Sequence, residues 1–361
     1  MNTTVNMTLQ DLGYNNYFEK LRIDNNLKDF EIGRVISEQK ERYIVKSEKG
    51  EFEAEITGNL RFSAKSRKDF PAVGDWVSLI YHETDFAVIN SILPRISTLS
   101  RQAVNKFGEL QIIASNIDYG LIVQSVNRDF NINRLERYLT LCYTSRIEPI
   151  IVITKTDLTD EENLNDLLNK IKIRVKNVPL IPVSNETKEG IDKLKKLLYK
   201  GKTYCLLGSS GVGKSSLINS LIGESRMKTA NISQSIDRGK HVTTRRELIP
   251  MINGAILIDN PGMREVGITD SSLGIESTFE KIYDLAQSCK FSDCTHTSEI
   301  GCAVQLAIDN GQIEKSHFEN FLKMEREKEH YESAVAEKRR KDKDFGKMIK
   351  HYKKTKKSNN F

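Results

Sequence analysis

The chain has 361 residues, 29% of them charged, and a formal net charge of +6. This length exceeds what one hydrophobic core usually organises, so two or three domains are expected. Its apolar runs are far shorter than the ~20 residues of a membrane-spanning helix, and the N-terminus lacks the pattern of a signal peptide. We therefore expect a cytoplasmic protein that does not enter a membrane.

The first part of the chain predicts a lead-in and a small β-barrel. Residues 1–30 are polar with a few aromatic side chains, and we expect a short helical lead-in to which no function is assigned. Residues 31–100 hold five short alternating runs separated by turn-rich breaks, which predicts a barrel of the OB or SH3-like type. Such barrels often bind RNA. The basic side chains of its long loop are candidate phosphate contacts, although such residues more often simply face solvent; they are Arg61, Lys65, Arg67 and Lys68.

Residues 101–270 alternate short apolar strands with amphipathic helical stretches. The pattern predicts a parallel sheet covered by helices on both faces. The expected strands are residues 119–126, 149–153, 178–183, 203–207 and 255–258. In sheets of this kind, ligands bind at the carboxyl ends of the strands.

A phosphate-loop motif follows the fourth of these strands and opens a predicted helix, which is the context that the motif requires. Its residues are Gly208, Ser209, Ser210, Gly211, Val212, Gly213, Lys214, Ser215 and Ser216. Lys214 can reach the β- and γ-phosphates, and the Ser215 hydroxyl can ligate magnesium. Asp259 ends the last strand and can hold the same magnesium, directly or through water. The Gly262 N–H can contact the γ-phosphate.

A second motif indicates guanine recognition. Thr154, Lys155, Thr156 and Asp157 follow the second strand and look like the Asn-Lys-x-Asp motif of GTPases. A carboxylate at Asp157 can accept hydrogen bonds from the N1–H and amino groups of guanine, which adenine cannot supply. Thr154 stands where Asn is usual in that motif.

The order of the motifs is reversed relative to ordinary GTPases. Ser184 and Asn185 follow the third strand and occupy the place of the Ser-Ala element, whose backbone approaches the base oxygen. Both guanine elements precede the phosphate loop. The domain is therefore predicted to be circularly permuted, which is feasible because the termini of domains commonly lie close together.

A cysteine cluster predicts a metal site in a helical domain of residues 271–336. The pattern is C-x4-C-x-H-x5-C, and the four candidate ligands are Cys289, Cys294, His296 and Cys302. Four such ligands suit a tetrahedral zinc that stabilises a small domain and performs no catalysis. The alternative is that these cysteines pack as small apolar residues, which is our interpretation of Cys142 and Cys205.

The last segment, residues 337–361, is predicted to be a disordered basic tail. Residues 338–361 hold eleven Lys or Arg against two Asp. Such a tail suits nucleic acid, although it could equally serve only to keep the protein in solution.

Together, the barrel, the permuted motifs, the segments GKHVTT (239–244) and DNPG (259–262) and the cysteine pattern resemble the RsgA, or YjeQ, family of GTPases, over about residues 30–330. The resemblance implies an OB-fold domain, a circularly permuted GTPase domain and a zinc domain. It also implies an enzyme that binds the small ribosomal subunit and its rRNA, assists late maturation, and hydrolyses GTP to GDP and phosphate when the particle stimulates it. Departures from the family pattern are Thr154, Asn185 and Asn260.

Two other functions stay open, namely a large-subunit assembly GTPase and an RNA chaperone that holds nucleotide with negligible turnover. No repeat or coiled-coil seam calls for a dimer, and a monomer is expected.

The catalytic group is harder to assign, because Met263 follows Gly262 where Ras-like GTPases commonly carry Gln, and a thioether cannot orient water. The polar segment before the strand that leads to Asp259 belongs where switch I lies. Within it, either Thr243 or Thr244 could complete the magnesium shell. His241 resembles the switch histidine of the family and could position the attacking water. The alternative is that His241 contacts rRNA or solvent.

Overall fold

The structure is a computed structural model that describes residues 7–39, 41–82, 85–103, 106–127, 130–222, 246–259 and 272–358. The chain divides into two compact units. One unit consists of residues 1–101 and 110–266, and the other of residues 102–109 and 267–361. In the part of the chain that is described, no helix has the length and apolar character needed to span a bilayer.

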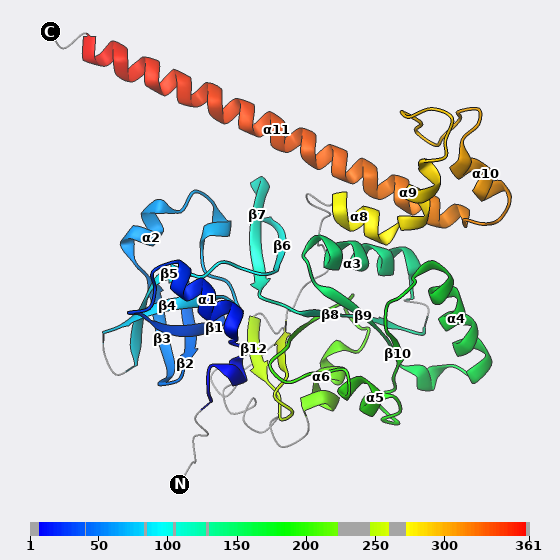
Figure 1. The fold of residues 1–361 in the computed structure, drawn as a ribbon, viewed down its shortest axis with the longest axis horizontal. Helices are drawn as coiled ribbons and strands as arrows, with labels where there is room; N and C mark the ends of the chain where they lie inside the picture. Colours follow the sequence, from blue (N-terminus) through cyan, green and yellow to red (C-terminus); the bar gives the residue numbers. More distant parts are fainter. Residues whose placement is uncertain are drawn as a thin grey trace. The chain divides into compact units, whose positions relative to one another are not determined.

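Figure 1 labels most of the elements along the chain. The strands are β1 (Glu31–Gln39), β2 (Arg42–Ser47), β3 (Gly50–Ile56), β4 (Trp76–Tyr81), β5 (Phe86–Ile92), β6 (Thr98–Ala103), β7 (Lys106–Ser115), β8 (Tyr119–Ser125), β9 (Glu148–Thr154), β10 (Leu180–Pro182), β11 (Thr203–Leu207), β12 (Arg246–Pro250) and β13 (Ile256–Asp259). The helices are η1 (Gln10–Leu12), α1 (Asn16–Asp24), α2 (Gly58–Ser63), η2 (Arg67–Asp69), α3 (Ile132–Thr144), η3 (Thr156–Leu158), α4 (Glu161–Arg174), α5 (Ile191–Lys195), α6 (Lys214–Ile222), α8 (Ser272–Thr278), α9 (Glu280–Ala286), α10 (Ala303–Asp309) and α11 (Lys315–Ser358).

Strands β1 to β5 close into a barrel in the order β1-β2-β3-β5-β4, with β4 pairing back onto β1. Along β3, exposed and buried residues alternate, as expected for a strand with one face toward a core. The inward residues include Val35, Val45, Phe52, Val77 and Ile89. Helix α2 follows the third strand. This closed five-stranded arrangement confirms the predicted OB-like barrel.

The lead-in packs on one side of the barrel, around Trp76. Tyr14 meets the Trp76 ring edge-on with centroids 4.9 Å apart, and Phe18 lies 5.6 Å from it. Asn15 caps α1, because its side chain accepts hydrogen bonds from the backbone N–H groups of Tyr17 and Phe18.

The second sheet region is parallel in the order β10-β9-β8-β11-β13, and β12 is added antiparallel to β13. Helices α3 and α4 bury Leu135, Leu139 and Ile171 in one core, whereas α5 and α6 bury Leu194 and Leu217 in another. The predicted parallel sheet with helices on both faces is confirmed. Because its strands are parallel, β8, β9, β11 and β13 all end at the same edge.

Strand β12 links the two sheet regions, and the sequence did not predict it as a strand. It pairs with β1 of the barrel on one side and with β13 on the other. At Glu247 the two pairings share one residue, which stands opposite Ser37 on β1 and opposite Asp259 on β13. The barrel and the parallel sheet are therefore parts of one continuous sheet.

A buried arginine joins the lead-in, the barrel and the parallel-sheet region. The guanidinium of Arg34 on β1 donates to the carbonyls of Leu12 (2.5 Å), Gly74 (3.1 Å) and Asn116 (3.1 Å). It also lies 5.3 Å from the centroid of the Trp76 ring. Burial lowers the pKa of Arg34 to about 10, whereas the charges of Asp118 and Asp75 raise it. The group thus remains a cation near neutral pH.

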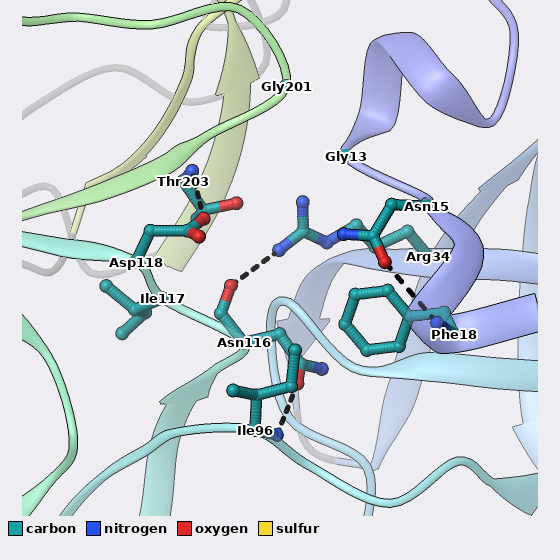
Figure 2. A pocket seen from close by; sticks show the side chains of 10 residues that line it. All are labelled: Gly13, Asn15, Phe18, Arg34, Ile96, Asn116, Ile117, Asp118, Gly201 and Thr203. Atoms are coloured by element: carbon teal, nitrogen blue, oxygen red, sulfur yellow. Dashed lines mark hydrogen bonds between the residues drawn. The ribbon is translucent and has the colours of Figure 1, made fainter. Parts of the chain in front are cut away.

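Arg34 lines a small pocket at this junction, shown in Figure 2 with Asn116 and Asp118 on its other side. The Asp118 carboxylate accepts hydrogen bonds from the Lys202 ammonium (2.7 Å) and the Thr203 N–H (2.8 Å). None of the site residues predicted from the sequence lines this pocket.

The second unit has its own core, formed by α8, α9, α10 and the first turns of α11. Its buried side chains include Phe279, Ile282, Val304, Phe321 and Met324. Helix α11 then continues to Ser358, through most of the segment for which the sequence predicts a disordered tail. The physical reason is composition, because the segment is rich in Lys and Arg, which favour a helix, and has no proline.

Candidate functional site

The phosphate loop joins the end of β11 to the start of α6, at the carboxyl edge of the parallel strands. Gly208, Gly211 and Gly213 have φ values of 152°, 84° and 91°, a region that favours glycine. At Gly208 a Cβ atom would also collide with the Val123 carbonyl of β8. The loop therefore lies close against the neighbouring strand, and only glycine fits there.

Two groups of opposite charge lie at this loop. The Lys214 ammonium donates to the carbonyls of Gly208 (2.8 Å) and Ser209 (2.5 Å). Burial raises the pKa of Asp259, at the end of β13, while the charge of Lys214 lowers it. A desolvated carboxylate is stabilised by a nearby cation, so the position of Asp259 suits a magnesium ligand. Ser215 lies next to Lys214 in the first turn of α6.

The guanine-reading segment follows β9, on the same edge. The Ser184 hydroxyl donates to the Asp157 carboxylate at 2.5 Å and accepts from the backbone N–H groups of Glu186 and Thr187. Ser184 is fully buried. The element after β10 thus orients the carboxylate that the sequence assigns to the base.

Thr154 ties the guanine-reading segment to the phosphate loop. Its hydroxyl oxygen lies 2.5 Å from the Val212 carbonyl and 3.2 Å from the Gln124 carbonyl, and the residue is fully buried. A hydroxyl has one hydrogen to donate, and the shorter distance assigns it to Val212. Threonine therefore links the two segments even though the usual Asn is absent.

Asn185 provides a second link. Its side-chain oxygen accepts a hydrogen bond from the Ser220 hydroxyl of α6 at 3.2 Å. The segment after β10 is thereby attached to the helix that follows the phosphate loop.

Helix α3 holds the other side of the phosphate loop, a feature that sequence reasoning missed. Arg134 donates to the Ser209 hydroxyl at 2.8 Å. Tyr138, one turn later, also hydrogen-bonds Ser209; burial raises the pKa of this phenol and the hydrogen bond lowers it. The i, i+4 spacing puts both on one helix face, but nothing in the sequence connects that face with Ser209.

Other predicted site residues fall outside the described part of the chain. They are His241, Thr243, Thr244 and Gly262.

The four predicted metal ligands come together in the second unit. Their ligand atoms all lie within 4.8 Å of one another. The Cys289 and Cys302 sulfurs are 3.8 Å apart, and each is 3.5 Å from Nδ1 of His296. Ligands about 2.3 Å (sulfur) and about 2.0 Å (nitrogen) from a tetrahedral zinc would be separated by roughly 3.5 to 3.8 Å. The cluster therefore fits such an ion and can bind a metal.

The surrounding backbone supports this geometry. Cys302 caps α10, and its sulfur accepts a hydrogen bond from the Gln305 N–H at 3.4 Å. The Gln305 side chain donates to the His296 carbonyl, which helps to hold a residue with a φ of 59°. Hydrogen bonds of this kind orient ligands around a metal.

Comparisons with known proteins agree with the site. The family model described as RsgA GTPase matches residues 92–269. An ABC transporter model matches residues 191–354. That range includes the phosphate loop, a motif common to many nucleotide-binding proteins, but it excludes the segment Thr154 to Asp157.

Similar proteins cover nearly the whole chain. The protein named small ribosomal subunit biogenesis GTPase RsgA 2 from Listeria monocytogenes serotype 4b (strain F2365) is 44% identical, over 89% of each chain. RsgA 1 of Bacteroides thetaiotaomicron is 37% identical over 94% of this chain and 95% of its own.

Solved structures give the same result. YjeQ from Thermotoga maritima superposes with a TM-score of 0.61 at 28% identity, covering 81% of this chain and 96% of that one. YloQ, described as a circularly permuted GTPase, gives a TM-score of 0.58 at 25% identity, covering 81% and 93%. The permuted order of the nucleotide motifs is thus confirmed, and the chain belongs to the RsgA GTPase family, whose members are GTP hydrolases.

Proposed function

We propose that this GTPase acts in the biogenesis of the small ribosomal subunit, as a cytoplasmic monomer that binds the particle and its rRNA. It assists late maturation and hydrolyses GTP to GDP and phosphate when the particle stimulates it. The observation that carries the proposal is the 44% identity, over 89% of each chain, with a GTPase named for that process.

Each part of the nucleotide site has a role in this proposal. The phosphates lie in the loop from Gly208 to Ser216, with Lys214 at the β- and γ-phosphates. Thr154 to Asp157, with Ser184 and Asn185, bind the guanine. Magnesium, when bound, would neutralise phosphate charge, and Ser215 and Asp259 would hold it together with Thr243 or Thr244. His241 positions the attacking water, and the Gly262 N–H contacts the γ-phosphate.

The metal of the second unit is, in this proposal, one structural zinc. Three sulfurs and one imidazole nitrogen are ligands that zinc prefers in closed tetrahedral sites. The separations of 3.5 and 3.8 Å between ligand atoms support that geometry.

The function is tested by measuring GTP hydrolysis by the full-length protein alone, with purified small subunits, and with purified large subunits. We expect stimulation by small subunits only. Stimulation by large subunits would instead indicate a large-subunit assembly factor. Particle binding without turnover under any of the three conditions would indicate an RNA chaperone.

A further inference from the structure

The barrel presents a nearly free aromatic ring within a basic segment. Residues 57–70, which comprise α2, η2 and the connection between them, are called the α2 platform below. Phe62 on this platform is 91% exposed. The platform holds four basic residues against one acid, Asp69.

The platform is firmly attached to the barrel, so the ring has a defined position. Leu60 and Phe70, on either side of Phe62, pack against the barrel core. The Thr57 side chain caps α2 by accepting from the Leu60 N–H at 3.2 Å. Ser66 and Asp69 form a capping box around η2.

Polar contacts hold the platform from two further sides. Glu41, after β1, accepts hydrogen bonds from both Arg61 (2.7 Å) and Arg67 (3.0 Å). Arg95 donates to the carbonyls of Lys68 (2.6 Å) and Phe70 (2.8 Å). Because these groups are already ordered in the free protein, less conformational entropy is lost when a partner binds.

The charges indicate which partner fits. Glu41 engages Arg61 and Arg67, whereas the described residues form no ion pair with Lys65 or Lys68. An apolar protein surface covering Phe62 would have to desolvate these ammonium groups. A single-stranded nucleic acid avoids that cost, because its bases stack on aromatic rings and its phosphates attract lysines.

From this juxtaposition we infer that Phe62 stacks on an unpaired RNA base while Lys65 and Lys68 contact the flanking phosphates. The inference rests on the proposed function, since the small subunit would supply the RNA. It adds a specific point of contact on the barrel.

The first test compares the affinity of full-length variants for small subunits in the presence of a non-hydrolysable GTP analogue. Phe62→Ala should weaken binding about tenfold, a loss within the range that one aromatic–base stack supplies. Phe62→Trp should bind at least as well as the wild type. Ile173→Ala, at a site on α4 that is 68% exposed, is the matched control and should change nothing. Wild-type affinity in Phe62→Ala would overturn the inference.

The second test asks whether the contact is with a base. In Phe62→Trp, the new indole fluorescence should be quenched by a short single-stranded oligouridylate but not by an abasic strand of equal length. Lys65→Ala with Lys68→Ala should reduce the salt dependence of strand binding. Equal effects of both strands on the fluorescence, or weakened subunit binding without quenching by RNA, would show that Phe62 contacts something other than a base.

The two proposals fail in different ways. If the wild type neither binds small subunits nor responds to them, the proposed function is wrong, and the quenching experiment still decides whether Phe62 stacks on RNA. If small subunits stimulate Phe62→Ala and bind it as they do the wild type, the function stands and the stack is wrong.

Discussion

Asp157 carries the choice of base in the proposed site, and Ser184 fixes its carboxylate at 2.5 Å. In Asp157→Asn, one acceptor becomes a donor, which matches the 2-oxo group of xanthine and opposes the amino group of guanine. GTP affinity should fall at least about tenfold while affinity for xanthosine triphosphate rises, because mismatched buried polar groups are costly. Competition titrations measure both. Asp166→Asn, exposed on α4, is the control, and an unchanged preference for GTP in Asp157→Asn would contradict the assignment.

Thr154 is the residue whose departure from the family pattern the structure explains. Thr154→Val keeps the shape but removes the hydroxyl that reaches the Val212 carbonyl. We expect it to lower the free energy of unfolding by about 1 kcal/mol, the usual net value of such a bond, and to weaken GTP binding. Thr154→Ser retains the hydroxyl and should behave nearly as the wild type. Urea unfolding and calorimetric titration test this, and equal effects of the two substitutions would exclude the hydrogen bond as the cause.

In the absence of magnesium, the ionised carboxylate of Asp259 should destabilise the folded protein. Because burial raises its pKa in the folded state, the unfolded state releases this proton first, and stability falls as pH rises through the folded-state pKa. Asp259→Asn should therefore stabilise the magnesium-free protein near neutral pH and much less under acidic conditions, while abolishing most hydrolysis. Thermal unfolding across pH measures this. Destabilisation of the magnesium-free protein near neutral pH would mean that the charge of Lys214 outweighs burial.

At the scale of elements, the cysteine cluster determines whether the second unit can form its core. Its helices α8, α9 and α10 have seven residues each, too short to persist alone. Removing a ligand by Cys302→Ala should therefore lose both the metal and the helical signal of this unit, because metal-binding energy is folding energy here.

Metal analysis of the wild type should find one zinc per chain. GTP affinity of Cys302→Ala provides the internal control and should stay near the wild-type value. A protein purified without chelators that contains no zinc, yet shows a cooperative transition for the second unit, would contradict this account.

The elements also show how much of the fold can be predicted from the sequence. Strands β8, β9, β11 and β13 were predictable because short apolar runs signal buried parallel strands. Strand β12 was not, since its five residues alternate too briefly and end in a proline. In the site, motif spacing predicted the phosphate loop and the four metal ligands. The contacts of Arg134 and Tyr138 with Ser209 connect positions more than seventy residues apart. No local sequence pattern can therefore predict them.

At the scale of the whole molecule, Arg34 joins three segments that lie far apart in the sequence, through the carbonyls of Leu12, Gly74 and Asn116. Arg34→Met would remove the donor of the buried Leu12 and Asn116 carbonyls and leave the Gly74 carbonyl with the Asn116 side chain alone. We expect a loss of about 3 kcal/mol in the free energy of unfolding. Arg22→Met is a matched control, because Arg22 also donates to three carbonyls, those of Leu27, Lys28 and Phe30, all nearby in the chain. It should cost about 1 kcal/mol. If urea unfolding shows that Arg34→Met and Arg22→Met lose the same unfolding free energy, Arg34 has no special role in joining these segments.

Strand β12 limits which truncated forms of this protein can be used to study its parts. Removing the barrel to ask what it contributes would strip β1 from β12 and leave a bare strand edge, open to pairing with another copy. That edge would run through Glu247, which stands directly opposite Asp259 on the adjacent strand. A truncated protein that aggregates or loses turnover would therefore report a damaged sheet, whether or not the barrel touches RNA. Point substitutions on the outer surface of the barrel are the way to separate recognition from folding.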